Sequence, residues 1–209
     1  MKVGVLALQG DVPEHLRALA TIVPDHRLAT VRRPADLAAV DALFLPGGES
    51  TTIARLLWKA DLWRPLGERI AHGMPVLATC AGLILLAREL APCPTGVNPP
   101  SFEVLDVTVR RNDYGAQRES FEGDVRVTGL KGPNFPGVFI RAPRILAVGR
   151  AATPVAWWND EVVGVRQGSV WGLTFHPELS PDRRLHRLFL SDAQRRLTRP
   201  KGRSRARPR

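Results

Sequence analysis

Short apolar runs alternate with amphipathic stretches over the first 90 residues, and this alternation constrains the fold more than any other feature of the chain. Residues 3–8 (VGVLAL) form a continuous apolar run, which is typical of a strand covered on both faces. Asp11 and Glu14 follow with the spacing of a helix N-cap and its third helical residue. Strand, turn and helix in repetition indicate a parallel sheet between helices. We therefore predict an α/β fold with a three-layer, mostly parallel sheet flanked by helices.

The same reasoning predicts further elements along the chain. In the first half, further strands are expected at residues 26–31, 42–45 and 75–79, and helices at 12–23, 34–40, 53–60 and 83–90. The second half contains short β patterns at 104–109, 124–128, 138–140, 155–158, 161–166 and 170–174, then an amphipathic helix over 185–197. These patterns predict antiparallel strands in the second half of one α/β domain, residues 1–194.

The net charge of +10 comes mostly from the C-terminal end. Residues 195–209 hold eight Lys and Arg and no acid, which leaves the rest of the chain at +2. A like-charged segment cannot bury enough apolar surface to order itself, so we expect a disordered basic tail over 195–209. The tail has no interleaved aromatic residues, which argues against nucleic-acid binding.

Membrane insertion and secretion are not indicated. The longest apolar run, residues 76–87, is interrupted and far shorter than the ~20 residues that span a bilayer. The N-terminus lacks the succession of regions that marks a secretory signal. Two cysteines, Cys80 and Cys93, are too few for a disulfide framework and fit a reducing compartment. A cytoplasmic location is expected.

Cys80 lies at the junction between a predicted buried strand and a predicted helix, with small residues on both sides (ATCAG, residues 78–82). A sharp strand-to-helix turn that exposes a nucleophile needs small residues two positions away on either side, because the backbones approach closely there. The N-terminus of the helix that follows favours the thiolate. A structural cysteine in a buried strand is the alternative that this residue alone leaves open.

A base for Cys80 is available in His176-Pro177-Glu178. Residues two apart in an extended segment share a face, and Pro177 holds the backbone extended. A carboxylate beside an imidazole can fix its tautomer and stabilise the imidazolium. A surface histidine near a glutamate is common, so this tripeptide alone is weak evidence for a catalytic base. Together with the turn at Cys80 it is much stronger evidence.

Residues 45–51 (LPGGEST) place two glycines between a strand and a helix. Such a loop presents free backbone N–H groups above the sheet edge, where they can stabilise an oxyanion. A plain strand-to-helix turn is the simpler interpretation. A phosphate-binding loop is excluded, because no Lys follows the glycines in the required place.

Together these motifs resemble a class I (triad) glutamine amidotransferase with its flavodoxin-like sheet, and more closely the glutaminase subunit of the two-component pyridoxal 5′-phosphate synthase. The resemblance covers residues 2 to about 190. The segments that carry it are VGVLALQGDVPEH (3–15), LPGGEST (45–51), TCAGLILLA (79–87), LDVTVRRNDYG (105–115), FEGD (121–124), GVFIRAPRI (137–145) and GLTFHPEL (172–179).

The resemblance implies a role for each matching residue. Cys80 is implied as the nucleophile, His176 as the general base and acid, and Glu178 as its orienting carboxylate. The backbone N–H groups of Gly48 and Ala81 would form the oxyanion hole. The substrate glutamine would be bound by Gly48, Glu49, Ser50, Arg111, Ile140 and Arg141. The surface facing a partner synthase would include Gln9, Gly10, Asp11, Glu14 and His15.

The resemblance also implies the reaction and its partner. The chain would hydrolyse L-glutamine and channel the ammonia to a synthase that makes pyridoxal 5′-phosphate from ribose 5-phosphate and glyceraldehyde 3-phosphate. The two subunits would form a large ring with one glutaminase per synthase, and the glutaminase would need neither cofactor nor metal. It would be poorly active until docked.

The sequence departs from the family pattern in places, and other functions stay open. Residue 78 is Ala where Gly is common, and residue 116 is Ala where Arg is typical. The loss of that positive charge at position 116 would weaken partner docking or a local ion pair. The basic tail lies outside the resemblance. One alternative is a glutaminase subunit of another amidotransferase, of the imidazole-glycerol-phosphate or anthranilate type; a second is a non-catalytic binding module on the same fold.

Overall fold

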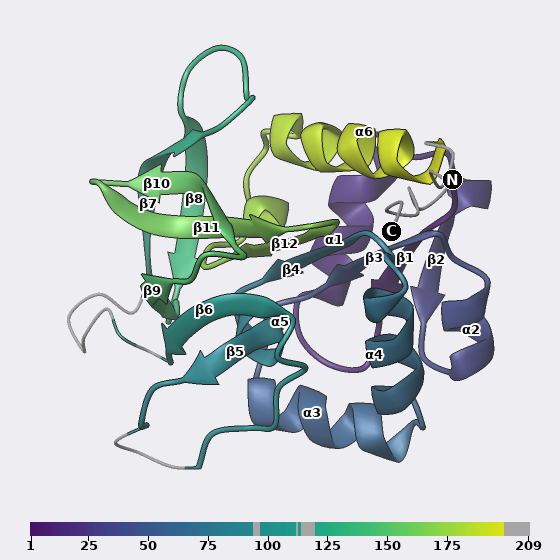
Figure 1. The fold of residues 1–209 in the computed structure, drawn as a ribbon. Helices are drawn as coiled ribbons and strands as arrows, with labels where there is room; N and C mark the ends of the chain where they lie inside the picture. The colour runs from purple at the N-terminus through teal and green to yellow at the C-terminus, as the bar shows by residue number, and fades with distance from the viewer. Residues whose placement is uncertain (94–96, 112, 114–119, 199–209) are drawn as a thin grey trace, which may run out of the picture.

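The computed structural model describes residues 1–93, 97–111, 113 and 120–198. Within these residues the strands of the main sheet follow the order β2-β1-β3-β4-β12-β11-β10-β7-β8 (Figure 1). The half from β2 to β12 is parallel, and the pairs from β12 to β8 are antiparallel. These strands are β1 (Val3–Leu6), β2 (Leu28–Val31), β3 (Ala42–Leu45), β4 (Val76–Thr79), β7 (Ser120–Val127), β8 (Phe135–Ile140), β10 (Thr153–Trp158), β11 (Glu161–Gln167) and β12 (Val170–Leu173).

Helices cover both faces of the parallel half, so the expected three-layer α/β fold is confirmed (Figure 1). Alternate side chains of β3 show the division: Leu43 and Leu45 pack toward α2–α5, and Phe44 packs toward α1 and α6. The helices are α1 (Val12–Ala20), α2 (Pro34–Ala38), α3 (Ser50–Lys59), α4 (Trp63–Ala71), α5 (Ala81–Leu86) and α6 (Arg184–Thr198), with 3₁₀ turns η1 (Asp25–Arg27) and η2 (Pro177–Leu179).

A smaller sheet, in the order β5-β6-β9, lies beside the main one. It corrects the predicted helix over 83–90: α5 ends at Leu86 and the chain continues as strand β5 (Ala87–Leu90). The helix-forming residues of this segment adopt a strand because they pair with β6 (Leu105–Arg110), and tertiary pairing overrides local propensity. The third strand, β9 (Arg144–Val148), was not predicted.

Helix α4 was also missed, because Pro65 and Gly67 obscure its periodicity. Pro65 lies in the first turn, where its absent N–H has no intrahelical acceptor to lose. Gly67 lies beside the ring of Phe102, whose Cδ1 would be at an ordinary contact distance of 3.4 Å from an added Cβ.

Helix α6 extends to Thr198, in agreement with the helix predicted over 185–197, so residues 195–198 of the expected basic tail form its last turn. Arg195 and Arg196 pair there with the buried Asp192, at 3.4 and 3.0 Å. The rest of the expected tail, 199–209, lies outside the described residues, as does Ala116. No helix within the described ranges combines the length and apolar character needed to cross a membrane.

Candidate active site

Cys80 occupies a strained turn between β4 and α5, with φ 47° and ψ −104°. Its N–H donates to the carbonyl of Leu173 in β12, at 2.9 Å. Gly82 makes the turn possible, because an added Cβ would lie 2.4 Å from the Leu45 carbonyl oxygen and 3.2 Å from the Cβ of Ala78. Ala78 is therefore accommodated because residue 82 is glycine. A non-glycine residue held at positive φ is typical of a functional site.

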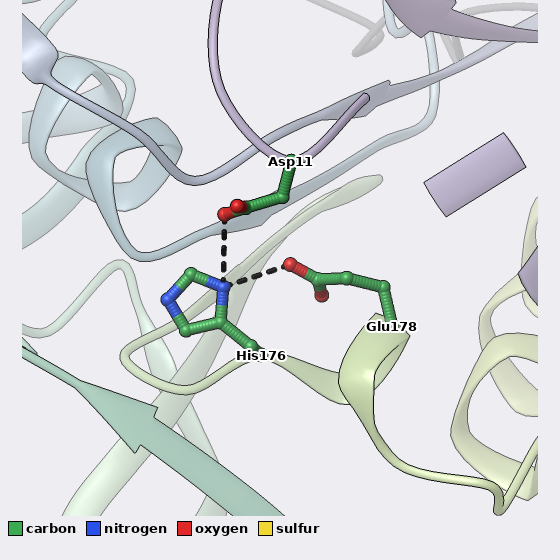
Figure 2. Close-up of side chains that lie close together, drawn as sticks. All are labelled: Asp11, His176 and Glu178. Atoms are coloured by element: carbon green, nitrogen blue, oxygen red, sulfur yellow. Dashed lines mark hydrogen bonds and ion pairs between the residues drawn. The ribbon is translucent and has the colours of Figure 1, made fainter. Parts of the chain in front are cut away.

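His176 comes shortly after the end of β12, and Cys80 comes directly after β4. Because β12 and β4 are parallel neighbours, the two side chains lie at the same end of the sheet and line one cavity. Its Nδ1 lies 2.8 Å from Glu178 Oε1 and 3.3 Å from Asp11 Oδ2 (Figure 2). Because Nδ1 faces two carboxylates, it carries the proton of the neutral ring and leaves Nε2 as the base. Nε2 is buried and makes no hydrogen bond to the described residues.

Charges around His176 favour its protonated form. Burial of the ring opposes this, but the contacts with Asp11, Cys80 and Glu178 outweigh burial and raise the pKa of His176 far above its ordinary value. Glu178 shows the complementary effect: burial favours the neutral acid, yet His15 and His176 hold the pKa of Glu178 well below its ordinary value. An imidazolium formed when Cys80 loses its proton is thus strongly stabilised.

The loop after β3 is fixed by the loop after β1. Glu49 N–H donates to Gln9 Oε1 at 2.9 Å, and Asp11 N–H donates to the Gly47 carbonyl at 3.2 Å. Gly10 permits this contact, since an added Cβ would lie 1.8 Å from the Gly47 oxygen. Gly48 has φ +145°, a conformation that favours glycine. The conformation of residues 9–11 is therefore coupled to that of the loop after β3, residues 46–49, which we call the glycine loop.

Arg111 and Glu49 form an ion pair at the cavity wall, with Nη2 2.9 Å from Oε1. Glu49 also caps α3, because its side chain accepts the Thr52 N–H at 2.7 Å. Hydrogen bonds from Thr52 and Thr51 and the charge of Arg111 outweigh burial and lower the pKa of Glu49. Glu49 is thus an ionised acceptor whose oxygens already have partners.

These groups surround one cavity of about 290 Å³. Roughly 300 Å³ is the lower end of the range for ligand pockets, so the cavity suits a small metabolite. Arg141, at φ 41°, lies on its rim, and the Cys80 Sγ lies 3.9 Å from the carbonyl oxygen of Ile140. The lining residues are Gln9, Gly10, Asp11, Gly48, Glu49, Ser50, Cys80, Ile84, Arg111, Ile140, Arg141 and His176.

Most residues expected at the site therefore meet at one sheet edge, and a few lie elsewhere. Ala81, whose N–H begins α5, and Glu178 are buried behind the cavity. His15 corrects an expectation: it cannot face a partner, because it is fully buried. Ile84 was missed, and no sequence signal separated it from the other apolar residues of its helix. Of the motif around Arg111, residues 112, 114 and 115 lie outside the described residues.

The fold and this cavity place the chain in a known class. It belongs to the SNO glutamine amidotransferase family, whose model matches residues 5–195. A crystal structure described as a glutamine amidotransferase is 43% identical, with a TM-score of 0.84 over 93% of this chain and all of that one. A glutamine amidotransferase from Thermotoga maritima, 19% identical with a TM-score of 0.58 over 96% of this chain and 88% of that one, shares the fold.

Particular relatives carry one name. A protein of Thermococcus onnurineus, 47% identical over 92% of this chain and 99% of its own length, is named pyridoxal 5′-phosphate synthase subunit PdxT. A protein of Mycolicibacterium smegmatis with the same name is 50% identical over 90% of this chain and 96% of its own length.

Proposed function

We propose that this chain is the glutaminase subunit of a pyridoxal 5′-phosphate synthase and hydrolyses L-glutamine to L-glutamate and ammonia. The observation that carries the proposal is the placement of Cys80. It occupies a strained strand-to-helix turn and shares a small cavity with His176, whose Nδ1 is held 2.8 Å from Glu178. The family and the name of the relatives agree with this chemistry.

In the first half of the reaction, His176 Nε2 accepts the proton of the Cys80 thiol, and the sulfur attacks the side-chain amide carbon of glutamine. The N–H groups of Gly48 and Ala81 stabilise the oxygen that becomes negative. Collapse of the tetrahedral intermediate breaks the C–N bond, and the imidazolium returns its proton to the departing nitrogen. The products are ammonia and a γ-glutamyl thioester on Cys80.

In the second half, water replaces ammonia. His176 accepts a proton from the water as its oxygen attacks the thioester carbon, and the imidazolium then protonates the departing sulfur. Glu178 and Asp11 stabilise the imidazolium in both halves through Nδ1. Glutamate is then released. While substrate or product is bound, the cations Arg111 and Arg141, which line the cavity, bind its α-carboxylate, and Glu49 and backbone groups bind its α-ammonium.

The partner is proposed to be the synthase subunit, which takes up the ammonia. Gln9, Gly10 and Asp11 are partly exposed and belong to the loop that contacts Gly47, and the partly exposed Glu14 follows them. Docking on them would act on the glycine loop and couple glutamine hydrolysis to the presence of the acceptor. A ring with one glutaminase per synthase, located in the cytoplasm, completes the proposal.

The test is ammonia release from glutamine by the chain alone and with the synthase subunit, for the wild type and Cys80→Ala. We expect release only with the synthase and only with Cys80 intact. Stimulation by a synthase of the imidazole-glycerol-phosphate or anthranilate type instead would assign another acceptor. Undiminished activity of Cys80→Ala would refute the mechanism.

A further inference from the structure

A fully buried histidine that the reaction above does not use lies directly behind Glu178. His15, on the inner face of α1, has its Nε2 3.4 Å from Glu178 Oε1 and 3.3 Å from Thr79 Oγ1. All three residues are buried: the exposed fractions of His15 and Thr79 are 0%, and that of Glu178 is 4%. Glu178 Oε1 therefore faces two imidazoles, His176 on the cavity side and His15 on the far side.

The position of His15 is well defined by its surroundings. Its ring packs against Phe44 of β3 with the centroids 5.8 Å apart, and its backbone N–H donates to the Asp11 carbonyl at 3.1 Å. Thr79 is the last residue of β4, next to the nucleophile. His15 thus joins the strand that ends at Cys80 to the turn that bears Glu178.

A buried carboxylate needs such a contact. Burying an ionised carboxylate costs on the order of several kcal/mol of free energy unless hydrogen-bond donors replace the lost water. Glu178 Oε2 has no hydrogen-bond partner among the described residues, so both donors act on Oε1. The contact with His15 is the leading influence that lowers the pKa of Glu178 against the effect of burial.

We propose that His15 is a positioning residue of the glutaminase reaction: it holds the Glu178 carboxylate ionised and aimed at His176. The proposal rests on the proposed function above. His15 does not line the cavity, so it contacts neither glutamine nor the reacting sulfur. Its effect passes through Glu178 to the basicity and orientation of His176.

The chain offers a matched control in His186. It is also fully buried and packs against Phe44, at a centroid distance of 5.9 Å, but both of its ring nitrogens lack a hydrogen bond among the described residues. The titratable groups that act on Glu178 are His15 and His176, with His186 coupled to it at longer range. Asp11 contacts the other member of the pair, His176.

The experiment compares His15→Leu, His15→Asn and His15→Gln with His186→Phe in ammonia release with the synthase subunit present. A glutamine amide nitrogen can occupy the place of the His15 Nε2, whereas the shorter asparagine cannot reach Glu178. Since a misplacement of about 1 Å can cost 100-fold in rate, we expect kcat to fall between tenfold and 100-fold in the Leu and Asn variants. The KM for glutamine should stay within twofold, and Gln should restore most of kcat.

The pH profile separates positioning from mere stability. Loss of a donor to Glu178 raises the proton affinity of the Glu178–His176 pair, so the kcat/KM profile of His15→Leu should move to higher pH. The profiles of His15→Gln and His186→Phe should stay in place. If Leu fails to fold, the Asn and Gln pair decides the question, because both are polar and only one reaches Glu178.

Two results would overturn the role of His15. One is an equal loss of kcat in His15→Gln and His15→Asn, and the other is an unchanged kcat and pH profile in His15→Leu. The proposed function is judged separately by the wild type. Should wild-type chain release no ammonia with any synthase, the pH dependence of Cys80 alkylation by iodoacetamide still compares the same variants. A dependence identical in the Asn and Gln variants would then overturn the proposal.

Discussion

The substitution Gly47→Ala tests how tightly the glycine loop fits against the catalytic ring. An added Cβ would lie 2.4 Å from His176 Cε1 and 2.8 Å from Asp11 Oδ2, whereas ordinary contact begins at 3.4 Å. Gly47 is not among the glycines with positive φ, so its backbone accepts Ala and the clash is with the imidazole. Relief of the clash requires a displacement of His176 by about 1 Å.

A displacement of this size costs on the order of 100-fold in rate. That factor corresponds to about 2.7 kcal/mol of lost transition-state stabilisation. We therefore expect kcat for ammonia release to fall about 100-fold, with the midpoint of thermal unfolding shifted by only a few degrees. The assay is ammonia release at saturating glutamine with the synthase subunit, beside circular dichroism of the same samples.

Gly67→Ala is the matched control. Its Cβ would stand at an ordinary 3.4 Å from Phe102, within helix α4 and remote from the cavity lining. Ala in place of Gly in a helix stabilises by roughly 0.5–1 kcal/mol, so this variant should unfold at higher temperature with unchanged kcat. A Gly47→Ala enzyme with the rate of the wild type would refute the geometry inferred for His176.

Three further predictions concern acid stability, substrate binding and the C-terminal helix. Burial lowers the pKa of His186 to about 3, so between about pH 6.5 and pH 3 only the unfolded chain binds its proton; stability should fall by up to about 1.4 kcal/mol per pH unit in this range, and urea unfolding at pH 7 and 5 should show a smaller loss in His186→Phe. Arg111→Lys should raise the KM for glutamine about tenfold with kcat nearly unchanged, because a lysine cannot reproduce the planar guanidinium that contacts Glu49 through Nη2 and the Val97 carbonyl through Nη1; a KM equal to that of the wild type contradicts the substrate role. A chain ending at Thr198 should match the full chain in thermal unfolding and activity, whereas one ending at Gln194 should unfold earlier because Asp192 loses Arg195 and Arg196; equal unfolding of both would contradict this role of the last turn.

Elements with a strong local signal were predictable from sequence. The apolar strands β1, β3 and β4 agree with their patterns, because all three are buried on both faces. Strand β5 was not predictable, because its pairing with β6 comes from residues distant in sequence. Helix α4 was hidden by a proline and a glycine whose tolerance depends on their positions in the helix.

The candidate site divides in the same way. The turn at Cys80 and the spacing of His176 and Glu178 are local features, so sequence reasoning reached them. The contacts of Asp11 with His176 and of His15 with Glu178 join segments more than 160 residues apart. Helical periodicity assigns His15 to a face of α1 but does not say what that face covers.

The central claim is that Cys80 is the sulfur that attacks the carboxamide of glutamine. The most direct measurement is to label the chain with a diazoketone analogue of glutamine, in the presence of the synthase subunit, and to locate the label by peptide mass spectrometry. The account predicts a single adduct on Cys80, suppressed by excess glutamine, with Cys93 unlabelled. Glutamine-protected labelling of Cys93, or inactivation with Cys80 unmodified, would contradict it.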